Sequence, residues 1–313
     1  RQTNHATIQA WRNKNYMKLI TTIIMTLLWV LNSQAQEFGT HWVSYPLPND
    51  SCEVWYRKLY TLKDRPLLAN ISLASTGNLR LYVNERNVTG SIFYEGMKDC
   101  MVMVRTFNIS RFLKKGENII AVWYAPTNNT DKSKQLSLDF YGWDKDTVAF
   151  YHQADGSWWC KQLNGCYMNG KESFDKREYT NEWKSAEYRS HGWLHPMGDF
   201  VGNNSTKIAE YTPLHSENKL SMVLYPANTY ADTLGYHVDF GRPFRGTIRL
   251  TIRDAHKGNV IDIDGNQYTC SGEMDEQAFF RFHCEERRVY TLNWSKRFKK
   301  SYITNIEGLE IKE

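Results

Sequence analysis

The chain has 313 residues and a formal net charge of +5, with 39 basic and 34 acidic side chains. Four of the basic residues and none of the acidic ones lie in residues 1–35, so the rest of the chain is nearly neutral. This balance removes the main electrostatic support for a nucleic-acid partner, and the cluster Lys296–Lys300 is typical of a solvated strand face. The length is enough for two domains and a linking segment.

Residues 17–35 have the pattern of a secretion signal. A short positive region precedes the apolar run Leu19–Leu31, and Ser33 and Ala35 place small side chains before a cleavage site. The run is too short to span a membrane comfortably. We therefore expect cleavage after Ala35, a secreted or periplasmic protein, and no membrane span in the mature form. Residues 1–16 would be an upstream extension.

Two stretches have clear strand patterns. In residues 69–90 a polar turn separates two segments in which apolar side chains recur at every second position, at Ile71, Leu73, Leu79, Leu81 and Val83. This period of two predicts half-buried strands. In residues 104–124 a polar turn precedes Ile119–Trp123, which is apolar on both faces, as in a central strand of a two-layer sandwich.

The rest of the chain favours strands and turns over helices. Residues 143–196 have weak periodicity and many aromatic side chains. Long periodic helices are missing, and Gly, Asn and Asp turns recur at the short intervals expected of sandwiches. We predict an all-β fold of two antiparallel β-sandwiches joined by a loop-rich connector. The expected boundaries are 1–35, 36–150, 151–200 and 201–313.

Several of these motifs resemble bacterial α-L-rhamnosidases. The stretch ANISLASTGNLRLYVN (69–84) is similar to the family's A-x-L-x-I-S-A-x-G-x-Y-x-L-Y-V-N, and DFGRPFRGTIRL (239–250) to its D-F-G-R-x-x-x-G-x-x-R-L. Residues 155–183 resemble its D-G-S-W … N-G-E-x-Y-D-A-R … W segment, with Glu172 and Asp175 at the acidic positions. The resemblance implies a galactose-binding-like jelly roll followed by a second β-sandwich. The family's catalytic carboxylates lie on a helical barrel, for which this chain has no segment of the needed length.

Six cysteines in a chain with an export signal suggest disulfides. Cys160 with Cys166 and Cys270 with Cys284 are close enough in sequence to close local loops, which leaves Cys52 with Cys100. We expect these pairs, and a Cys160–Cys166 bridge in particular. Buried thiols in the core are the competing interpretation.

Motifs of metal, nucleotide and serine-hydrolase chemistry are absent from the sequence, and we expect no cofactor. Asp262, Asp264, Asn266 and Glu273 have EF-hand spacing, but Gln267 occupies the position where that loop requires glycine. A turn between two strands explains these residues more simply. Structural calcium is the alternative.

Aromatic and acidic residues in the connector indicate a carbohydrate site, because sugars pair apolar C–H faces with hydroxyl groups. The candidate residues are Trp158, Trp159, Glu172, Asp175, Trp183, Tyr94 and Glu95. We expect a secreted, non-catalytic protein that binds poly- or oligosaccharides, including rhamnose-containing ones. The alternatives are a divergent or partial glycoside hydrolase and a module that docks on a partner enzyme. The tryptophans would instead seal an interdomain interface if they proved buried.

Overall fold

The computed structural model describes residues 41–47, 52–89, 102–126, 135–168, 171–199, 208–211, 219–280 and 283–312. The chain divides into two compact units, Arg1–Glu37 and Phe38–Glu313, and all described residues belong to the second. Within these ranges the regular elements are β-strands and short 3-10 helices, with no α-helix. The all-β prediction is therefore confirmed. No described helix has the length and hydrophobicity to cross a membrane.

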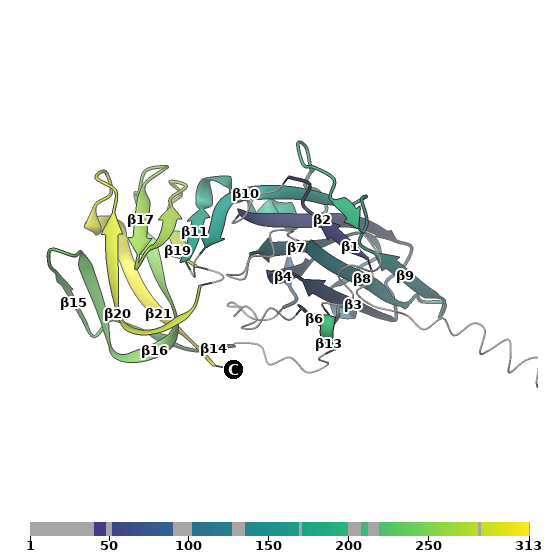
Figure 1. Cartoon of the computed structure of the whole chain (residues 1–313), viewed down its shortest axis with the longest axis horizontal. Helices are drawn as coiled ribbons and strands as arrows, with labels where there is room; N and C mark the ends of the chain where they lie inside the picture. Colours follow the sequence, from purple (N-terminus) through teal and green to yellow (C-terminus); the bar gives the residue numbers. More distant parts are fainter. Residues whose placement is uncertain are drawn as a thin grey trace, which may run out of the picture. The chain divides into compact units, whose positions relative to one another are not determined.

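The strands form two sheets (Figure 1). The seven-stranded sheet has the order β12-β1-β8-β3-β6-β13, with β9 beside β8. Its strands are β1 (Trp42–Ser44), β3 (Leu68–Ser75), β6 (Val102–Asn108), β8 (Gln135–Trp143), β9 (Ala149–Gln153), β12 (Met197–Asp199) and β13 (Ile208–Tyr211).

The fourteen-stranded sheet has the order β14-β21-β16-β20-β17-β18-β11-β10-β2-β7-β4-β5, with β15 and β19 beside β16. Its N-terminal strands are β2 (Cys52–Leu62), β4 (Asn78–Val83), β5 (Arg86–Asn87), β7 (Gly116–Ala125), β10 (Trp159–Met168) and β11 (Lys171–Asp175). The C-terminal strands are β14 (Lys219–Leu224), β15 (Asn228–Ala231), β16 (Tyr236–Ile252), β17 (Val260–Ile263), β18 (Asn266–Thr269), β19 (Glu276–Phe279), β20 (Glu285–Trp294) and β21 (Ile303–Lys312). The 3-10 helices are η1 (Ser110–Phe112), η2 (Lys176–Glu178), η3 (Asn181–Lys184) and η5 (Lys300–Tyr302).

The alternating residues of the first motif lie in one hydrophobic core. β3 and β4 belong to different sheets, so the turn after Ser75 carries the chain from one sheet to the other. The five apolar side chains of the motif are at most 3% exposed: Ile71, Leu73, Leu79, Leu81 and Val83. The period of two therefore places the apolar side chains of both strands between the sheets.

Strand β7 is covered on both faces, as its continuous apolar run predicted. Ile120, Val122 and Tyr124 face the core between the two sheets, whereas Ala121 and Trp123 face a second hydrophobic cluster. That second cluster also contains Val238, Ile248 and other side chains of the C-terminal strands. A single strand thus contributes to two cores.

A parallel strand pair continues the long sheet from the connector into the C-terminal strands. Ser173, Phe174 and Asp175 of β11 pair with Gln267, Tyr268 and Thr269 of β18. Beside this pair the Glu172 N–H donates to Asn266 Oδ1 at 2.9 Å, and Glu172 Oε2 accepts from the His283 N–H at 3.1 Å. The separation into two sandwiches, and its boundaries, stay predictions.

The expected local disulfides do not form. The five described cysteines are Cys52, Cys160, Cys166, Cys270 and Cys284, and none takes part in a disulfide. The Cys160–Cys166 pairing was wrong because both residues lie on β10, where their partners on β2 are Tyr56 and Cys52. Four residues of strand separate these partners by roughly 13 Å, beyond the Cα separation of about 7 Å that a disulfide tolerates.

The second local pair fails for a related reason. Cys270 lies in the core that contains Tyr268, whereas Cys284 packs against the separate cluster of Leu309 and Ile311. Cys100, the expected partner of Cys52, lies outside the described residues.

Asp262, Asp264 and Asn266 of the EF-hand-like spacing belong to a β-hairpin, as the simpler interpretation predicted, and Glu273 lies in the loop after β18. Asp264 and Gly265 connect β17 to β18 with φ of 50° and 86°, the left-handed pair that a two-residue hairpin turn requires. Asp264 faces Arg287 at 3.3 Å, and Glu273 pairs with Lys176. No group of three or more potential metal ligands gathers within the described ranges.

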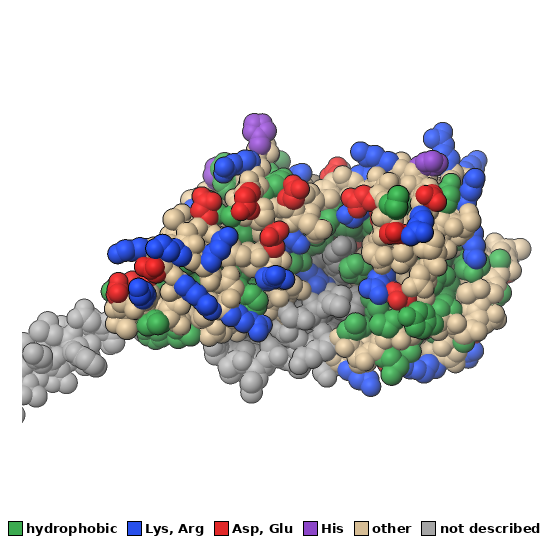
Figure 2. All heavy atoms as spheres, turned by 180° about the vertical axis from the view of Figure 1, so that it is seen from behind, with side chains coloured by type: hydrophobic (Ala, Val, Ile, Leu, Met, Phe, Trp, Pro, Cys, Tyr) green, Lys and Arg blue, Asp and Glu red, His purple; other side chains and the backbone are tan. Residues whose placement is uncertain are grey.

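Acidic and basic side chains are interspersed over the face shown in Figure 2. This mixture agrees with the nearly neutral balance of the sequence after residue 35.

Candidate functional site

A small pocket of about 10 Å³ lies beside the connector. Strands β2, β10 and β11 and helix η2 supply its walls, together with Tyr179, the residue that follows η2. The lining residues are Glu53, Trp55, Leu163, Gly165, Phe174, Asp175, Glu178 and Tyr179. Three aromatic rings and three carboxylates therefore meet at one small cavity.

The alternation of β2 explains how a carboxylate reaches this position. Val54 and Tyr56 face the core between the sheets, so Glu53 and Trp55 face the opposite side with the second cluster. Glu53 is fully buried, and its Oε2 accepts a hydrogen bond of 2.7 Å from the Trp123 indole N–H. This bond offsets part of the cost of burying the carboxylate.

The aromatic wall is held in place by other rings. Trp55 stacks on Trp183 with ring centroids 4.6 Å apart and 5° between their planes, and it meets Trp123 edge to face at 5.9 Å. Tyr179 stacks on Trp123 at 5.5 Å and meets Phe174 edge to face at 5.6 Å. Such ring pairs add roughly 0.5–1.5 kcal/mol each beyond burial, so they favour a preformed pocket.

The Trp55 side chain carries a buried hydrogen-bond donor. The Trp55 indole N–H is buried and has no hydrogen-bond partner among the described residues. A buried N–H without an acceptor costs about 1–3 kcal/mol, which an oxygen of a bound water or hydroxyl would recover.

The mouth of the pocket includes the start of η2. Asp175 caps this helix by accepting from the Arg177 N–H at 3.0 Å, and the Arg177 guanidinium donates to both its oxygens. Burial raises the pKa of the Asp175 carboxyl, but the Arg177 hydrogen bonds outweigh this and lower the pKa overall. Asp175 is therefore an ionised acceptor near neutral pH.

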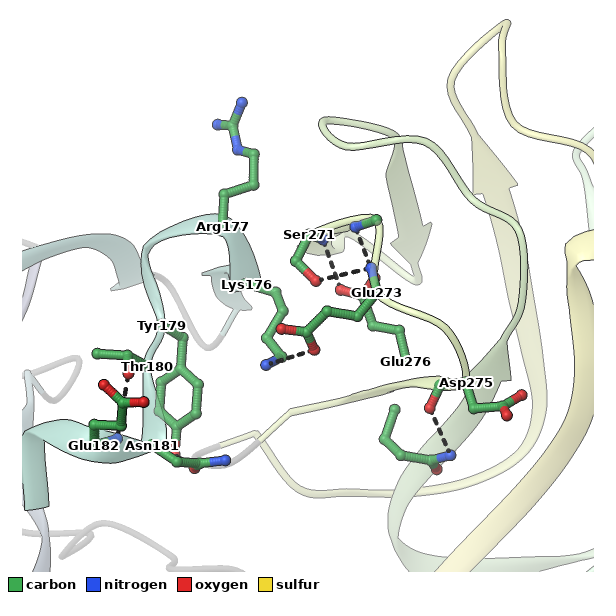
Figure 3. A network of polar contacts seen from close by, with 12 residues as sticks. Lys176, Arg177, Tyr179, Thr180, Asn181, Glu182, Ser271, Glu273, Asp275 and Glu276 are labelled. Carbon is green, nitrogen blue, oxygen red and sulfur yellow. Dashed lines mark hydrogen bonds and ion pairs between the residues drawn. The ribbon is translucent and has the colours of Figure 1, made fainter. Parts of the chain in front are cut away.

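An ion pair links η2 to the loop between β18 and β19. Figure 3 shows Lys176 pointing toward Glu273, and their charged atoms are 3.1 Å apart. The Glu276 carboxylate accepts from the backbone N–H groups of Ser271 and Gly272, at 2.7 and 3.2 Å, which fixes this loop. The loop is thus tied to the helix that carries Glu178.

The structure separates the candidate residues that the sequence grouped together. Asp175 lines the pocket. Trp158 and Trp183 are fully buried in the two hydrophobic cores, so neither ring has a face open to a sugar, and the stacking predicted for Trp158 is wrong for this structure.

Trp159 and Glu172 lie away from the pocket. Trp159 is half-buried and packs on His195, with ring centroids 3.9 Å apart. Glu172 is 1% exposed and bonds to backbone near the parallel strand pair, where it has a structural role. Tyr94 and Glu95 lie outside the described residues.

Sequence reasoning missed Glu53, Trp55, Phe174, Glu178 and Tyr179. One signal was available for Glu53. In the strand segment CEVWYR it shares a face with Trp55, so an acidic residue lies on an aromatic face that the fold buries. The contribution of η2 could not be foreseen, because it depends on how the connector folds back over β2.

The fold is that of the β-rich region of α-L-rhamnosidases. The enzyme from Dictyoglumus thermophilum matches with a TM-score of 0.74 at 14% identity, over 88% of this chain and 36% of that chain. The enzyme from Aspergillus terreus matches with 0.68 at 16% identity, over 88% and 36%. The Streptomyces avermitilis enzyme, solved with L-rhamnose, matches with 0.69 at 15% identity, over 84% and 29%. The chain thus spans about a third of the length of these enzymes.

No protein-family model matches the chain, and no curated protein sequence matches it.

Proposed function

We propose that this chain binds carbohydrate, as a non-catalytic region related to the β-domains of α-L-rhamnosidases. The observation that carries the proposal is the pocket in which Trp55, Phe174 and Tyr179 meet Glu53, Asp175 and Glu178. Trp55, Phe174 and Glu53 are buried, so the groups that a sugar can meet are the partly exposed Tyr179, Asp175 and Glu178. The Tyr179 ring suits the C–H face of a sugar, and the two carboxylates accept from its hydroxyl groups. The structural likeness to enzymes that act on rhamnosides supports the same class of ligand.

The pocket size limits the ligand to a small group. The enclosed cavity is only about 10 Å³, room for roughly one water molecule, far below the roughly 300–1,000 Å³ of sites for drug-sized molecules. We infer that a single hydroxyl group of a sugar enters it, while the sugar ring stays outside the cavity. A site with so few contacts is expected to bind weakly, with a Kd on the order of 0.1–1 mM.

Residues 17–35 have the pattern expected of a secretion signal, and an exported protein would meet polysaccharides outside the cytoplasm. We infer that the chain is exported and cleaved after Ala35, so that the mature protein begins at Gln36. N-terminal sequencing of the protein from its native host tests this inference. An intact Leu19–Leu31 segment in that protein would contradict it.

Titration calorimetry with L-rhamnose and rhamnose-containing oligosaccharides tests the binding site. Replacing Glu178 by Gln should weaken binding about tenfold, because a hydrogen bond to a charged group contributes about 1.5 kcal/mol. Glu182→Gln is the matched control, since Glu182 is exposed on η3 and lies outside the pocket. Equal effects of the two replacements would place the site elsewhere, and the absence of binding to any sugar would favour a docking module.

A further inference from the structure

Three cysteines lie on one face of the antiparallel pair β2 and β10. Cys52 and Cys166 are direct partners across the two strands, and Cys160 lies opposite Tyr56 further along. Cys52 and Tyr56 share a face because alternate residues of a strand point the same way. Cys160 is fully buried, whereas Cys52 and Cys166 are each partly exposed. An oxidant in solution can therefore reach Cys52 and Cys166 more easily than Cys160.

An irregularity in β10 creates this pairing. Gln162 lies opposite Val54, so an uninterrupted ladder would place residue 164 opposite Cys52. The register shift between Gln162 and Cys166 brings Cys166 there instead. Gly165 permits the shift, since an added Cβ would lie 2.8 Å from the Ser173 carbonyl oxygen.

The resulting geometry suits a covalent bond between the two sulfurs. Residues directly opposite each other in an antiparallel pair have Cα atoms about 4.5–5.5 Å apart. Disulfides need Cα separations of about 4.4–6.8 Å, so the backbone already meets this requirement. Burial raises the pKa of the Cys160 thiol to about 12, which leaves this third cysteine a poor nucleophile by comparison.

We propose that Cys52 and Cys166 form a reversible cross-strand disulfide by exchange with a low-molecular-weight disulfide such as oxidised glutathione. The thiolate of one cysteine attacks a glutathione sulfur, which forms a mixed disulfide and releases one glutathione thiolate. The thiolate of the other cysteine then attacks the protein sulfur of that bond and releases the second glutathione. The protein loses two electrons and two protons, and one molecule of oxidised glutathione becomes two molecules of the reduced form.

The bond would fix the strands that line the pocket. Cys52 is adjacent to Glu53 on β2, and Cys166 is adjacent to Gly165 on β10. Glu53 and Gly165 both line the cavity. The proposal stands on the register of the two strands and is independent of sugar binding. It replaces the sequence-based pairing of Cys166 with Cys160.

Peptide mapping of the full chain tests the proposal. The protein is equilibrated in reduced or in oxidised glutathione, alkylated, and digested without reduction. In the oxidised sample we expect a linked peptide pair containing Cys52 and Cys166, which separates on adding dithiothreitol. The oxidised protein should also unfold at a temperature about 5 °C higher, because the bond closes a long loop of the unfolded chain.

Two variants control the assignment. Cys52→Ser should abolish the linked peptide and the shift in unfolding temperature, whereas Cys160→Ala should retain both. Linkage of Cys52 to Cys100 or to Cys160 would overturn the proposal. So would separate glutathione adducts, or alkylation of both thiols, at every ratio of oxidised to reduced glutathione.

Discussion

The indole N–H of Trp123 donates a hydrogen bond of 2.7 Å to Oε2 of Glu53, and both side chains are fully buried. The bond joins the neighbouring strands β2 and β7 on the face that β7 presents to the second core. A buried carboxylate is costly unless it is hydrogen-bonded, so this contact helps the fold to tolerate an acidic group at the pocket. Glu53 therefore has a role in stability as well as a place in the candidate site.

Replacing Glu53 should separate these two roles. Glu53→Ala leaves the Trp123 N–H without its acceptor and should lower the free energy of unfolding by about 1–3 kcal/mol. Glu53→Gln keeps an oxygen at the same distance and should cost less. Urea unfolding followed by tryptophan fluorescence measures both. If the alanine variant is as stable as the wild type, the hydrogen bond contributes nothing to the fold.

Trp183 should behave as a core residue. It is fully buried and stacks on Trp55, so Trp183→Ala should destabilise the protein by about 3–5 kcal/mol. Tyr225→Ala, at a side chain that is 65% exposed, is the control and should change stability by less than about 0.5 kcal/mol. Thermal or urea unfolding measures the difference. A Trp183→Ala variant of normal stability that has lost sugar binding would restore Trp183 to the binding site.

Much of the fold could be predicted from local patterns. The alternation at Ile71, Leu73 and Leu79 and the two-sided apolar run Ile119–Trp123 each indicated which faces are buried, because side-chain direction follows strand periodicity. These patterns could not show that β3 and β4 lie in different sheets. Strand pairing depends on contacts between distant segments, which no single stretch of sequence contains.

The candidate site was harder to predict for the same reason. Asp175 was identified, but Trp158 and Trp183 were grouped with it only because they are close in sequence. Trp158 immediately precedes β10 and lies in the core between the sheets with Cys160, whereas Trp159, the first residue of β10, packs against the second cluster. The cysteine pairing failed similarly, since Cys160 and Cys166 are near in sequence but are held apart along one strand.

Purified protein should release no aglycone from an aryl α-L-rhamnoside. In the pocket Asp175 is held by Arg177, and Glu53 is fully buried and bonded to Trp123, so neither is arranged to serve as a solvent-accessible acid or base. A chromogenic assay against a heat-inactivated sample measures this. Turnover above that background, lost in both Glu53→Gln and Glu178→Gln, would instead favour a glycoside hydrolase with its site in the pocket.

Stability should fall in acid through Glu285. Burial raises the pKa of its carboxyl, but contacts from His283 and Arg287 outweigh this and lower the pKa to about 2, from an ordinary value of 4.5. Its Oε1 lies 3.5 Å from His283 Nε2 and 2.9 Å from Arg287 Nε. A carboxyl whose pKa is lower in the folded state stabilises the protein above its unfolded pKa. That contribution is lost as the pH falls from about 4.5 to about 2.

The variant Glu285→Gln isolates this contribution. At pH 6 it should be less stable than the wild type by roughly 2 kcal/mol, a value reduced for the partial exposure of the side chain, and the difference should disappear near pH 2. Urea unfolding at a series of pH values measures the two proteins in parallel. Glu286→Gln makes the same chemical change at an exposed neighbour. If Glu286→Gln reproduces the same dependence on pH, the contacts of Glu285 with His283 and Arg287 are not its cause.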